Sequence, residues 1–342
     1  MKFGKFVLIS AIAILAVSCD WEHIDLGVDV NVNKKVETSS QEFLKIDSEK
    51  SLAADKSGEI AIVKEAESNI VTPPTSLPST GKTQIGSMNI IVDKLPEIAE
   101  GAEIEPSQIQ LEIDNPAEKP VRFSGDVKAG GDLGEFSVIV PSKSDDYDAL
   151  FAKDANQAAS GADEIIAPTE SLQKVLEKDF TGKMQVDVEV SDPAKGGVKL
   201  AAADAYVFEV AGKLITPFHF NKGTKITITH TLRDLGLNLG DYDINANNFV
   251  IYATVTSTIP FDIECTGKDV KGVTAKTDNP IKAGTIANPV TTEVQISVKG
   301  ANAAETIEDV TLYFELTATQ GAKINKNQSL KIDYEKVKVS AF

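Results

Sequence analysis

The sequence predicts a mainly β protein that is built from two antiparallel β-sandwich units. Three observations point to this fold class. Short segments alternate apolar and polar residues, proline and glycine separate them at intervals typical of sandwiches, and one series of segments recurs later in the same order. Alternation with a period of two places every second side chain on one face. That is the pattern of a strand that is buried on one side only.

Three regions precede the first unit. Residues 1–18 have the pattern of an export signal. Residues 19–40 are interpreted as a polar tether followed by a first strand, because apolar residues alternate from Ile24 to Val32. Residues 41–84 remain uncertain. Within them, Ile60 to Val63 favours a strand, whereas three prolines between Thr72 and Gly81 indicate a loop, since proline removes a backbone donor and fixes φ.

The first sandwich unit is predicted over residues 85–233. Ile109, Leu111 and Ile113 alternate with polar residues, prolines interrupt the pattern, and Val121 to Gly125 resumes it. This unit is longer than the second one, and its extra residues are expected to form a short helical insertion. Residues 145–157 hold few helix breakers. Thr169 is suited to cap a second helix whose apolar face is Leu172, Val175 and Leu176.

A second unit is predicted over residues 245–342, joined to the first by a leucine-rich connection at 234–244. Residues 109–125 align without a gap with residues 249–265. Three further echoes follow in the same order: 184–190 with 294–298, 206–210 with 312–316, and 226–230 with 330–334. Ordered repetition of this kind indicates internal duplication. On this hypothesis residues 245–342 should fold alone.

The N-terminal segment has the order of an export signal that ends at a cysteine. Lys2 and Lys5 precede twelve residues, Phe6 to Val17, in which only Ser10 is polar, and Ser18 stands directly before Cys19. The apolar run is short for a membrane span. The junction resembles the lipobox of bacterial lipoproteins of the Bacteroidota type. It departs from the commonest form, because Leu15 lies four positions before the cysteine and Ala16 occupies the usual leucine position.

The resemblance implies that residues 1–18 are removed and that Cys19 carries fatty acyl chains, palmitate among them, which anchor the protein in the outer membrane. The acidic residues Asp20, Glu22 and Asp25 loosely resemble a surface-export signal of the same bacteria, which implies the cell surface rather than the periplasmic face. The alternative is an ordinary cleaved signal that happens to precede a cysteine. The sandwich pattern itself is similar to immunoglobulin-like envelope domains.

Charge and composition exclude some partners and restrict the chemistry. The formal charge is −17, and removal of the two signal-segment lysines makes it −19, so nucleic acid binding is not expected. The cysteines are Cys19 and Cys265, and the histidines are His23, His219 and His230. With so few ligands, no cofactor and no zinc-type metal site is expected.

The sequence predicts a protein that is not an enzyme. It has no nucleophile elbow, no zinc-protease helix motif, no phosphate loop and no dinucleotide fingerprint. Two carboxylates would suffice for a glycosidase, so that class stays open. The scarcity of aromatic residues argues against a sugar cleft, because the single tryptophan, Trp21, lies beside the expected anchor.

One oxygen-rich stretch invites a calcium interpretation. Asp241, Asp243, Asn245 and Asn247 stand at alternate positions. An EF-hand would require glycine and glutamate at two later positions, which Ala246 and Tyr252 occupy instead. A polar turn is therefore the preferred interpretation, and these four residues remain a weak calcium candidate.

Isolated reactive side chains are interpreted as structural. His219 lies between Phe218 and Phe220, so in a strand it would face away from both rings and towards solvent. His230 falls near a strand end and is given no ligand role. Cys265 alternates with Phe261 and Ile263, so it is predicted to point into the core as a small apolar residue.

These observations predict a membrane-anchored, non-catalytic envelope lipoprotein that acts as a structural, adhesive or binding module. Two alternatives stay open. One is a glycan-binding lipoprotein of a polysaccharide-uptake system, and the other is a carrier that holds an apolar ligand between the two β units. The membrane is the one partner that the sequence predicts, because the expected lipid on Cys19 would insert into it. A protein or glycan partner is not identified.

Overall fold

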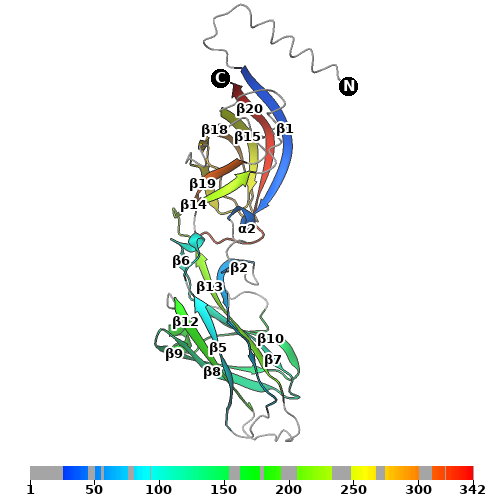
Figure 1. Ribbon diagram of the computed structural model, residues 1–342, viewed down its shortest axis with the longest axis vertical. Helices are drawn as coiled ribbons and strands as arrows, with labels where there is room; N and C mark the ends of the chain where they lie inside the picture. Colours follow the sequence, from blue (N-terminus) through cyan, green and yellow to red (C-terminus); the bar gives the residue numbers. More distant parts are fainter. Residues whose placement is uncertain are drawn as a thin grey trace, which may run out of the picture.

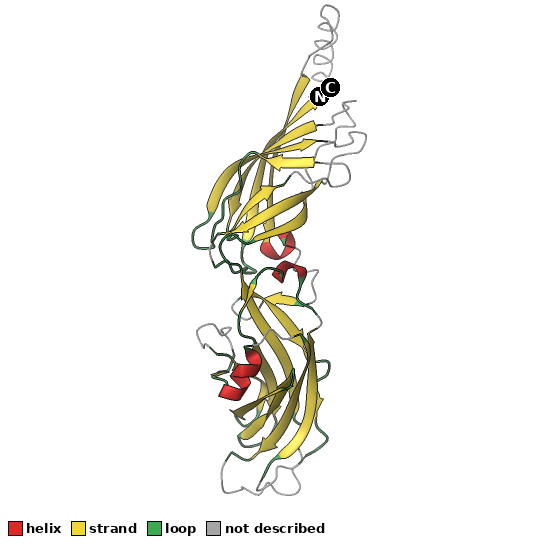
Figure 2. Cartoon of the chain, turned by 90° about the vertical axis from the view of Figure 1, so that its left-hand side faces the viewer, coloured by secondary structure: helices red, strands yellow, loops and turns green. Residues whose placement is uncertain are grey.

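A computed structural model of the chain describes residues 26–44, 51–54, 58–75, 81–92, 94–153, 162–177, 181–193, 206–232, 248–266, 274–299, 310–319 and 321–341. These residues are mostly in β-strands with a few short helices, which confirms the predicted fold class. The molecule is elongated, with two β bodies stacked end to end (Figures 1 and 2). We call the body that carries both chain ends proximal and the other body distal.

The distal body contains the middle of the chain in two sheets. Their hydrogen-bonded orders are β11-β10-β7-β13-β3-β2 and β5-β12-β8-β9, and the short strands β4 and β6 also pair with β13. Its elements are β2 (Leu52–Ala54), β3 (Ile60–Glu65), β4 (Ile70–Val71), β5 (Thr83–Val92), η2 (Glu97–Ala99), β6 (Glu103–Ile104), β7 (Gln108–Asn115), β8 (Val121–Ala129), β9 (Asp132–Val140), β10 (Ser144–Phe151), β11 (Glu164–Ile166), α3 (Glu170–Leu176), β12 (Gly182–Ser191) and β13 (Glu209–His219).

The proximal body combines the first described strand with the last third of the chain. Its sheets have the orders β1-β20-β15-β18-β17 and β14-β19-β16. Its elements are β1 (Leu26–Ser39), α2 (Ser40–Phe43), β14 (Lys225–Leu232), β15 (Asn248–Ser257), β16 (Phe261–Cys265), β17 (Thr274–Thr277), β18 (Val290–Lys299), β19 (Val310–Ala318) and β20 (Ser329–Ala341). The predicted first strand at 24–32 is confirmed over its described part by β1, and the strand-like residues 60–63 lie in β3.

Both bodies have the strand order of a jelly roll. In each, the first long strand pairs with the last, as β3 does with β13 and β1 with β20, and the last strand pairs in turn with β7 or β15. The second strand pairs with the one before last, as β5 does with β12 and β14 with β19. An immunoglobulin domain would pair its second strand with its fifth. The immunoglobulin-like expectation is therefore replaced by a double-sheet jelly roll.

The predicted domain boundaries differ from the strand pairing at two places. Residues 26–39 and 225–232 were expected to lie outside the second unit, but β1 pairs with β20 and β14 pairs with β19. The distal body is thus inserted between the first two strands of the proximal one. A fragment of residues 245–342 would lack two strands of its own sandwich, so the expectation that it folds alone is withdrawn.

The shared strand order supports the predicted duplication, although only one sequence echo joins equivalent strands. The echo of residues 109–125 with 249–265 matches β7 and β8 to β15 and β16, which occupy the same places in the two jelly rolls. The other three echoes join strands of different places. Alternation is common to all half-buried strands, so it could not tell them apart.

One of the two helices predicted for the insertion is confirmed. Thr169 caps α3, its hydroxyl accepting a hydrogen bond from the Leu172 N–H at 3.2 Å, and Leu172, Val175 and Leu176 are buried as predicted. α3 protects an edge strand: the Thr169 hydroxyl donates to the Glu135 carbonyl, and the Ser171 hydroxyl accepts from the Glu135 N–H. The insertion therefore covers the open edge of β9.

The predicted helix at residues 145–157 is wrong where it is described, because β10 occupies Ser144–Phe151. β10 lies between β7 and β11 and is covered on both faces, so Asp148 to Phe151 are buried consecutively. Such a run does not alternate and cannot be distinguished from a buried helix by period. Asp146, at φ 53°, marks the irregularity where the pairing register shifts.

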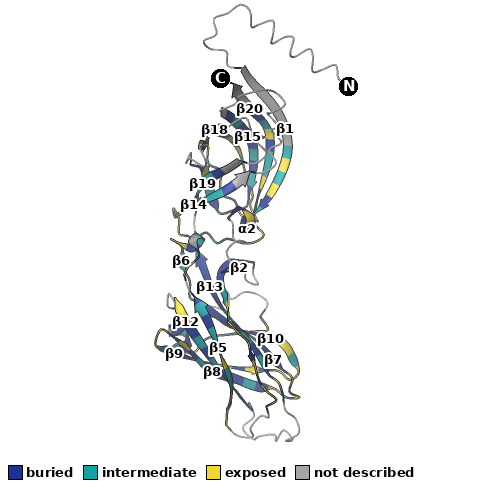
Figure 3. Ribbon diagram, in the orientation of Figure 1, coloured by how far each residue is buried: buried dark blue, intermediate teal, exposed yellow. Residues whose placement is uncertain are grey.

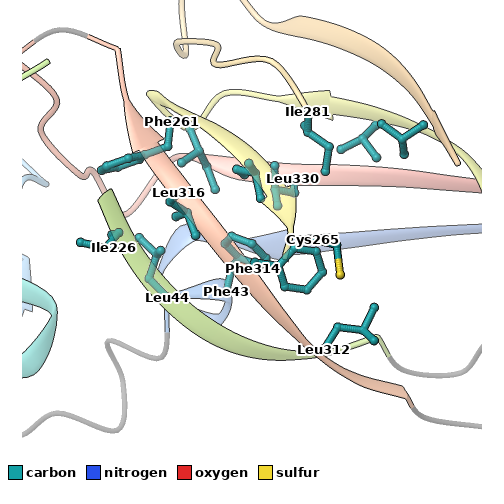
Figure 4. Close-up of a cluster of buried hydrophobic side chains, with 14 of the residues drawn as sticks. Phe43, Leu44, Ile226, Phe261, Cys265, Ile281, Leu312, Phe314, Leu316 and Leu330 are labelled. Carbon is teal, nitrogen blue, oxygen red and sulfur yellow. The ribbon is translucent and has the colours of Figure 1, made fainter. Parts of the chain in front are cut away.

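An apolar core lies between the two sheets of each body, and the proximal core extends into the adjoining end of the distal body (Figure 3). Large side chains that are less than 2% exposed fill both, among them Phe123, Phe151 and Phe208 in the distal body and Phe249 and Phe261 in the proximal one. Cys265 is 4% exposed and points into the proximal core beside Phe314 and Leu312, as predicted (Figure 4).

Candidate functional site

The strongest candidate site is the solvent-facing side of the larger proximal sheet. We call it the Tyr252 face, after the aromatic ring at its centre. It consists of the outward side chains of four adjacent strands, β20, β15, β18 and β17. Its members are Val250, Tyr252, Thr254, Thr274, Lys276, Asp278, Glu293, Gln295, Ser297, Lys299, Asp333, Glu335, Lys336 and Lys338.

The pairing register fixes the neighbours across this face. One row joins Lys338, Val250, Ser297 and Lys276 from four successive strands. The next row places Tyr252 between Lys336 and Gln295. Directly paired residues on one face of an antiparallel sheet lie about 4.5–5.5 Å apart at Cβ. Lysines of β20 and β17 therefore stand on either side of β15 and β18, and β1 lies beyond β20 with Asp29 paired opposite Lys338.

Four lysines stand on this face: Lys276, Lys299, Lys336 and Lys338. The Lys336 ammonium lies 4.7 Å from the centroid of the Tyr252 ring, a cation–π contact that orients the side chain. Lys276, Lys299 and Lys338 form no ion pair with any described residue. Elsewhere most lysines of the described chain are paired with a carboxylate, as in Lys119 with Asp192 at 2.6 Å.

Two of the carboxylates at this face are hydrogen-bonded to neutral groups. Asp278 Oδ1 accepts hydrogen bonds from the backbone N–H groups of Asn279 and Gln295, both at 2.8 Å. Glu335 Oε1 accepts from the Thr254 hydroxyl at 2.8 Å. Both carboxylates keep their charge, and Glu293 and Asp333 stand on the same side of the sheet, so the four lysines of the face meet an equal number of carboxylates.

A shallow depression of about 590 Å³ lies on the β17 and β18 side of the face. Its lining is mostly polar: Thr274, Ala275, Lys276, Thr277, Asp278, Gln295, Ser297 and Lys299. Ammonium, amide, hydroxyl and carboxylate groups line it, and such groups can bind hydroxyl-rich ligands. The described residues hold no group of three or more histidine, cysteine, aspartate or glutamate side chains placed to bind a metal ion.

A second polar cluster lies where the two bodies meet. The Lys323 ammonium, from the loop before β20, is 3.3 Å from Glu59 and 3.1 Å from Glu105 of the distal body. Burial alone would lower the pKa of Lys323, but the hydrogen bond that its ammonium donates to Glu105 and the charges of both carboxylates outweigh it and raise this pKa. His219 Nδ1 lies 3.0 Å from Glu105 Oε1 in the same cluster.

This cluster is a structural joint. Backbone hydrogen bonds continue the distal sheet into the proximal body, from Ile60 N–H to the Ile324 carbonyl and between Phe220 and Ala322 in both directions. His219 faces away from the buried rings of Phe218 and Phe220, as predicted, but it is only 22% exposed at its side chain because Glu105 covers it. It therefore belongs to the joint.

The other sequence-predicted residues fall in different places. Cys19 and the calcium candidates Asp241, Asp243, Asn245 and Asn247 lie outside the described residues. His230 is 8% exposed, and its ring centroid lies 4.9 Å from that of Phe43 with the two rings tilted at 54°, so it is a core residue of the proximal body.

In the sequence, Tyr252 was noted only because it stands where an EF-hand would need glutamate, and the face around it was not predicted. The available signal was the polar side of the alternation in β15, together with the lysines of the last strand. That signal could not be used without the pairing of β15 with β18 and β20.

No described helix is both long and apolar enough to cross a membrane. No family model matches the chain, and no curated protein matches its sequence. Among solved structures, a "putative secreted protein" from Parabacteroides distasonis ATCC 8503 is 14% identical, with a TM-score of 0.39, 92% of this chain covered and 100% of that chain. The major capsid protein P2 of bacteriophage PM2 is 10% identical, with a TM-score of 0.16 and coverage of 80% and 98%. Likenesses this distant do not bear on function.

Proposed function

We propose that the protein is an exported, lipid-anchored envelope protein that acts as a non-catalytic binding module. In this proposal acyl chains on Cys19 hold the proximal body near the outer membrane. The distal body then projects away from it. The cell surface is the proposed location, since the acidic residues after Cys19 are similar to a surface-export signal.

One observation carries the proposal: the described ends of the chain lie together at one tip of an elongated molecule (Figure 1). Leu26, at the start of β1, pairs with Ala341 near the end of β20. Cys19 precedes Leu26 by seven residues, which span at most about 25 Å when fully extended. A lipid at Cys19 would therefore hold this tip close to the membrane and leave the other end free.

The joint between the bodies supports a stiff rod. Backbone pairing and the Lys323 cluster connect the two bodies, and buried side chains of the distal strands, including Ile60 and Phe218, belong to the proximal core. A rigid spacer with an exposed polar face suits binding at a distance from the membrane. Cores filled with large side chains favour this reading over carriage of an apolar ligand.

The first prediction concerns the anchor. Cys19→Ala should remove the acylated thiol and move the protein from the membrane fraction to the soluble fraction, because several acyl chains on one residue give stable anchoring. The measurement is fractionation together with metabolic labelling by a palmitate analogue. Cys265→Ala is the matched control, since it removes the other cysteine, which is buried in the core, and should leave labelling and fractionation unchanged. Continued labelling of Cys19→Ala would sink the lipoprotein proposal.

Protease treatment of intact cells tests the side of the membrane. Digestion of the wild-type protein, with a periplasmic protein left intact, is expected for a surface location. Protection on intact cells followed by digestion after outer-membrane permeabilisation would place it on the periplasmic face instead.

A further inference from the structure

We propose that His219 is a proton-controlled lock of the joint between the two bodies. With a protonated ring it fixes the segment of residues 97–105 against β13, and without that proton the segment loosens and the joint weakens. This inference goes beyond the proposed function, because it concerns the regulation of the joint. It does not depend on the anchor at Cys19, so the two proposals can fail separately.

The segment of residues 97–105 connects the distal body with the proximal core. It contains η2 and β6 and lies where the two bodies meet (Figure 1). Ala99 is 1% exposed and belongs to the proximal core, and Ile104 packs against that core. The described backbone contacts between the segment and β13 are few: β6 pairs at two positions, and the Glu105 N–H donates to the Pro217 carbonyl. Side-chain contacts are therefore an important part of the attachment.

Both ring nitrogens of His219 face a carboxylate of this segment. Nδ1 lies 3.0 Å from Glu105 Oε1, and Nε2 lies 3.6 Å from Glu103 Oε2. A neutral imidazole carries a hydrogen on one nitrogen, so its other nitrogen would turn a lone pair towards a carboxylate oxygen. The doubly protonated ring instead presents an N–H to each carboxylate. The two oxygens are therefore placed for a positively charged ring.

The same proton completes a row of alternating charges. The charged groups that the structure describes around the ring are Glu103 and Glu105 of the segment, Glu59 before β3 and Lys323 before β20. The Lys323 ammonium contacts Glu59 and Glu105, and the ring contacts Glu105 and Glu103. With a positive ring, neighbouring charges in this row have opposite signs. With a neutral ring, Glu103 and Glu105 flank a group without charge, and the attraction that holds the segment to β13 falls.

Partial burial strengthens the effect of this one charge. The exposed fraction of the side chain is 22% for His219 and 13% for Glu105, so water and salt screen their interaction less than they screen a surface pair. Burial opposes the charge of Lys323, but its hydrogen bond to Glu105 and the two carboxylates raise its pKa, so the ammonium stays charged. Imidazole is the kind of group in this row that normally gains its charge between about pH 5 and 8. The lock is therefore complete at mildly acidic pH and is lost as the pH rises.

Amide hydrogen exchange of peptides that cover residues 97–105, read by mass spectrometry and corrected for the intrinsic rates, tests the inference. In the wild-type protein these amides should exchange at least about threefold more slowly at about pH 6 than at about pH 8, because opening of the segment breaks the added attraction. His219→Gln keeps a donor and an acceptor but gains no charge, so the difference should disappear. Glu103→Gln removes the carboxylate beside Nε2 and should reduce it. Glu100→Gln is the matched control. That residue is exposed on the same segment and is not among the groups described around the ring, so the variant should keep the wild-type difference.

Exchange in β15 shows whether a pH effect is local to the segment. An equal effect in β15 would point to His230, which is buried in the proximal core, and would overturn the inference. Equal corrected rates at both pH values in the wild type, or an undiminished difference in His219→Gln, would overturn it as well. If His219→Gln does not fold, Glu103→Gln decides: a full wild-type difference in that variant would show that the ring does not act through this carboxylate.

Discussion

Asn115→Ala should lower the free energy of unfolding by about 2–4 kcal/mol, because one fully buried amide holds two turns at the far end of the distal body together. Its Nδ2 group lies 3.1, 3.2 and 2.6 Å from the carbonyl oxygens of Lys119, Val140 and Pro141. Its Oδ1 accepts the Ala117 N–H at 3.1 Å. Alanine would leave these buried groups without the side chain that satisfies them. Urea unfolding at neutral pH measures the loss.

Asn69→Ala is the matched control, because that amide makes one exposed hydrogen bond to Glu209 and its loss should change stability by less than about 0.5 kcal/mol. Asn115→Asp separates the amide from simple packing. Its carboxylate would face three carbonyl oxygens, so the folded state should raise its pKa above the unfolded value. The variant should then lose stability as the pH rises above about 4. An Asn115→Ala variant as stable as Asn69→Ala would show that the turns do not depend on this residue.

The local features of this fold could be predicted from sequence because their causes are local. Alternation placed Cys265 in the core and turned His219 away from its aromatic neighbours. A capping threonine three residues before Leu172 located α3. Each prediction needed only the residues within one turn or one strand.

The partners of the strands could not be predicted, because period-2 alternation defines which face is buried and says nothing of the neighbour. β1 and β20 lie at opposite ends of the sequence, with Leu26 opposite Ala341. The same alternation would fit pairing with any other strand. The jelly-roll order and the inserted distal body follow from these long-range pairs. The Tyr252 face was missed for the same reason, since its lysines come from strands that are distant in sequence.

Phe220→Ala should lower the free energy of unfolding by about 3–5 kcal/mol and should also loosen the joint between the two bodies. Phe220 directly follows β13 of the distal body and is fully buried. Its ring lies 5.7 Å from Phe218 on its own strand and 5.4 Å from Phe261, the first residue of β16 in the proximal body. Truncation would open a cavity at a ring that contacts aromatic residues of both bodies.

Phe151→Ala separates loss of stability from loss of coupling. Phe151 is 1% exposed and packs against Phe136 at 5.6 Å inside the distal core, so its truncation should cost a similar free energy. Small-angle X-ray scattering under native conditions gives the second readout. Phe220→Ala should broaden the distribution of interatomic distances beyond that of a rigid rod, whereas Phe151→Ala should leave it unchanged. If both variants scatter like the wild type, the stiffness of the rod comes from the backbone pairing of Phe220 with Ala322 and from the Lys323 cluster, and the ring only fills space.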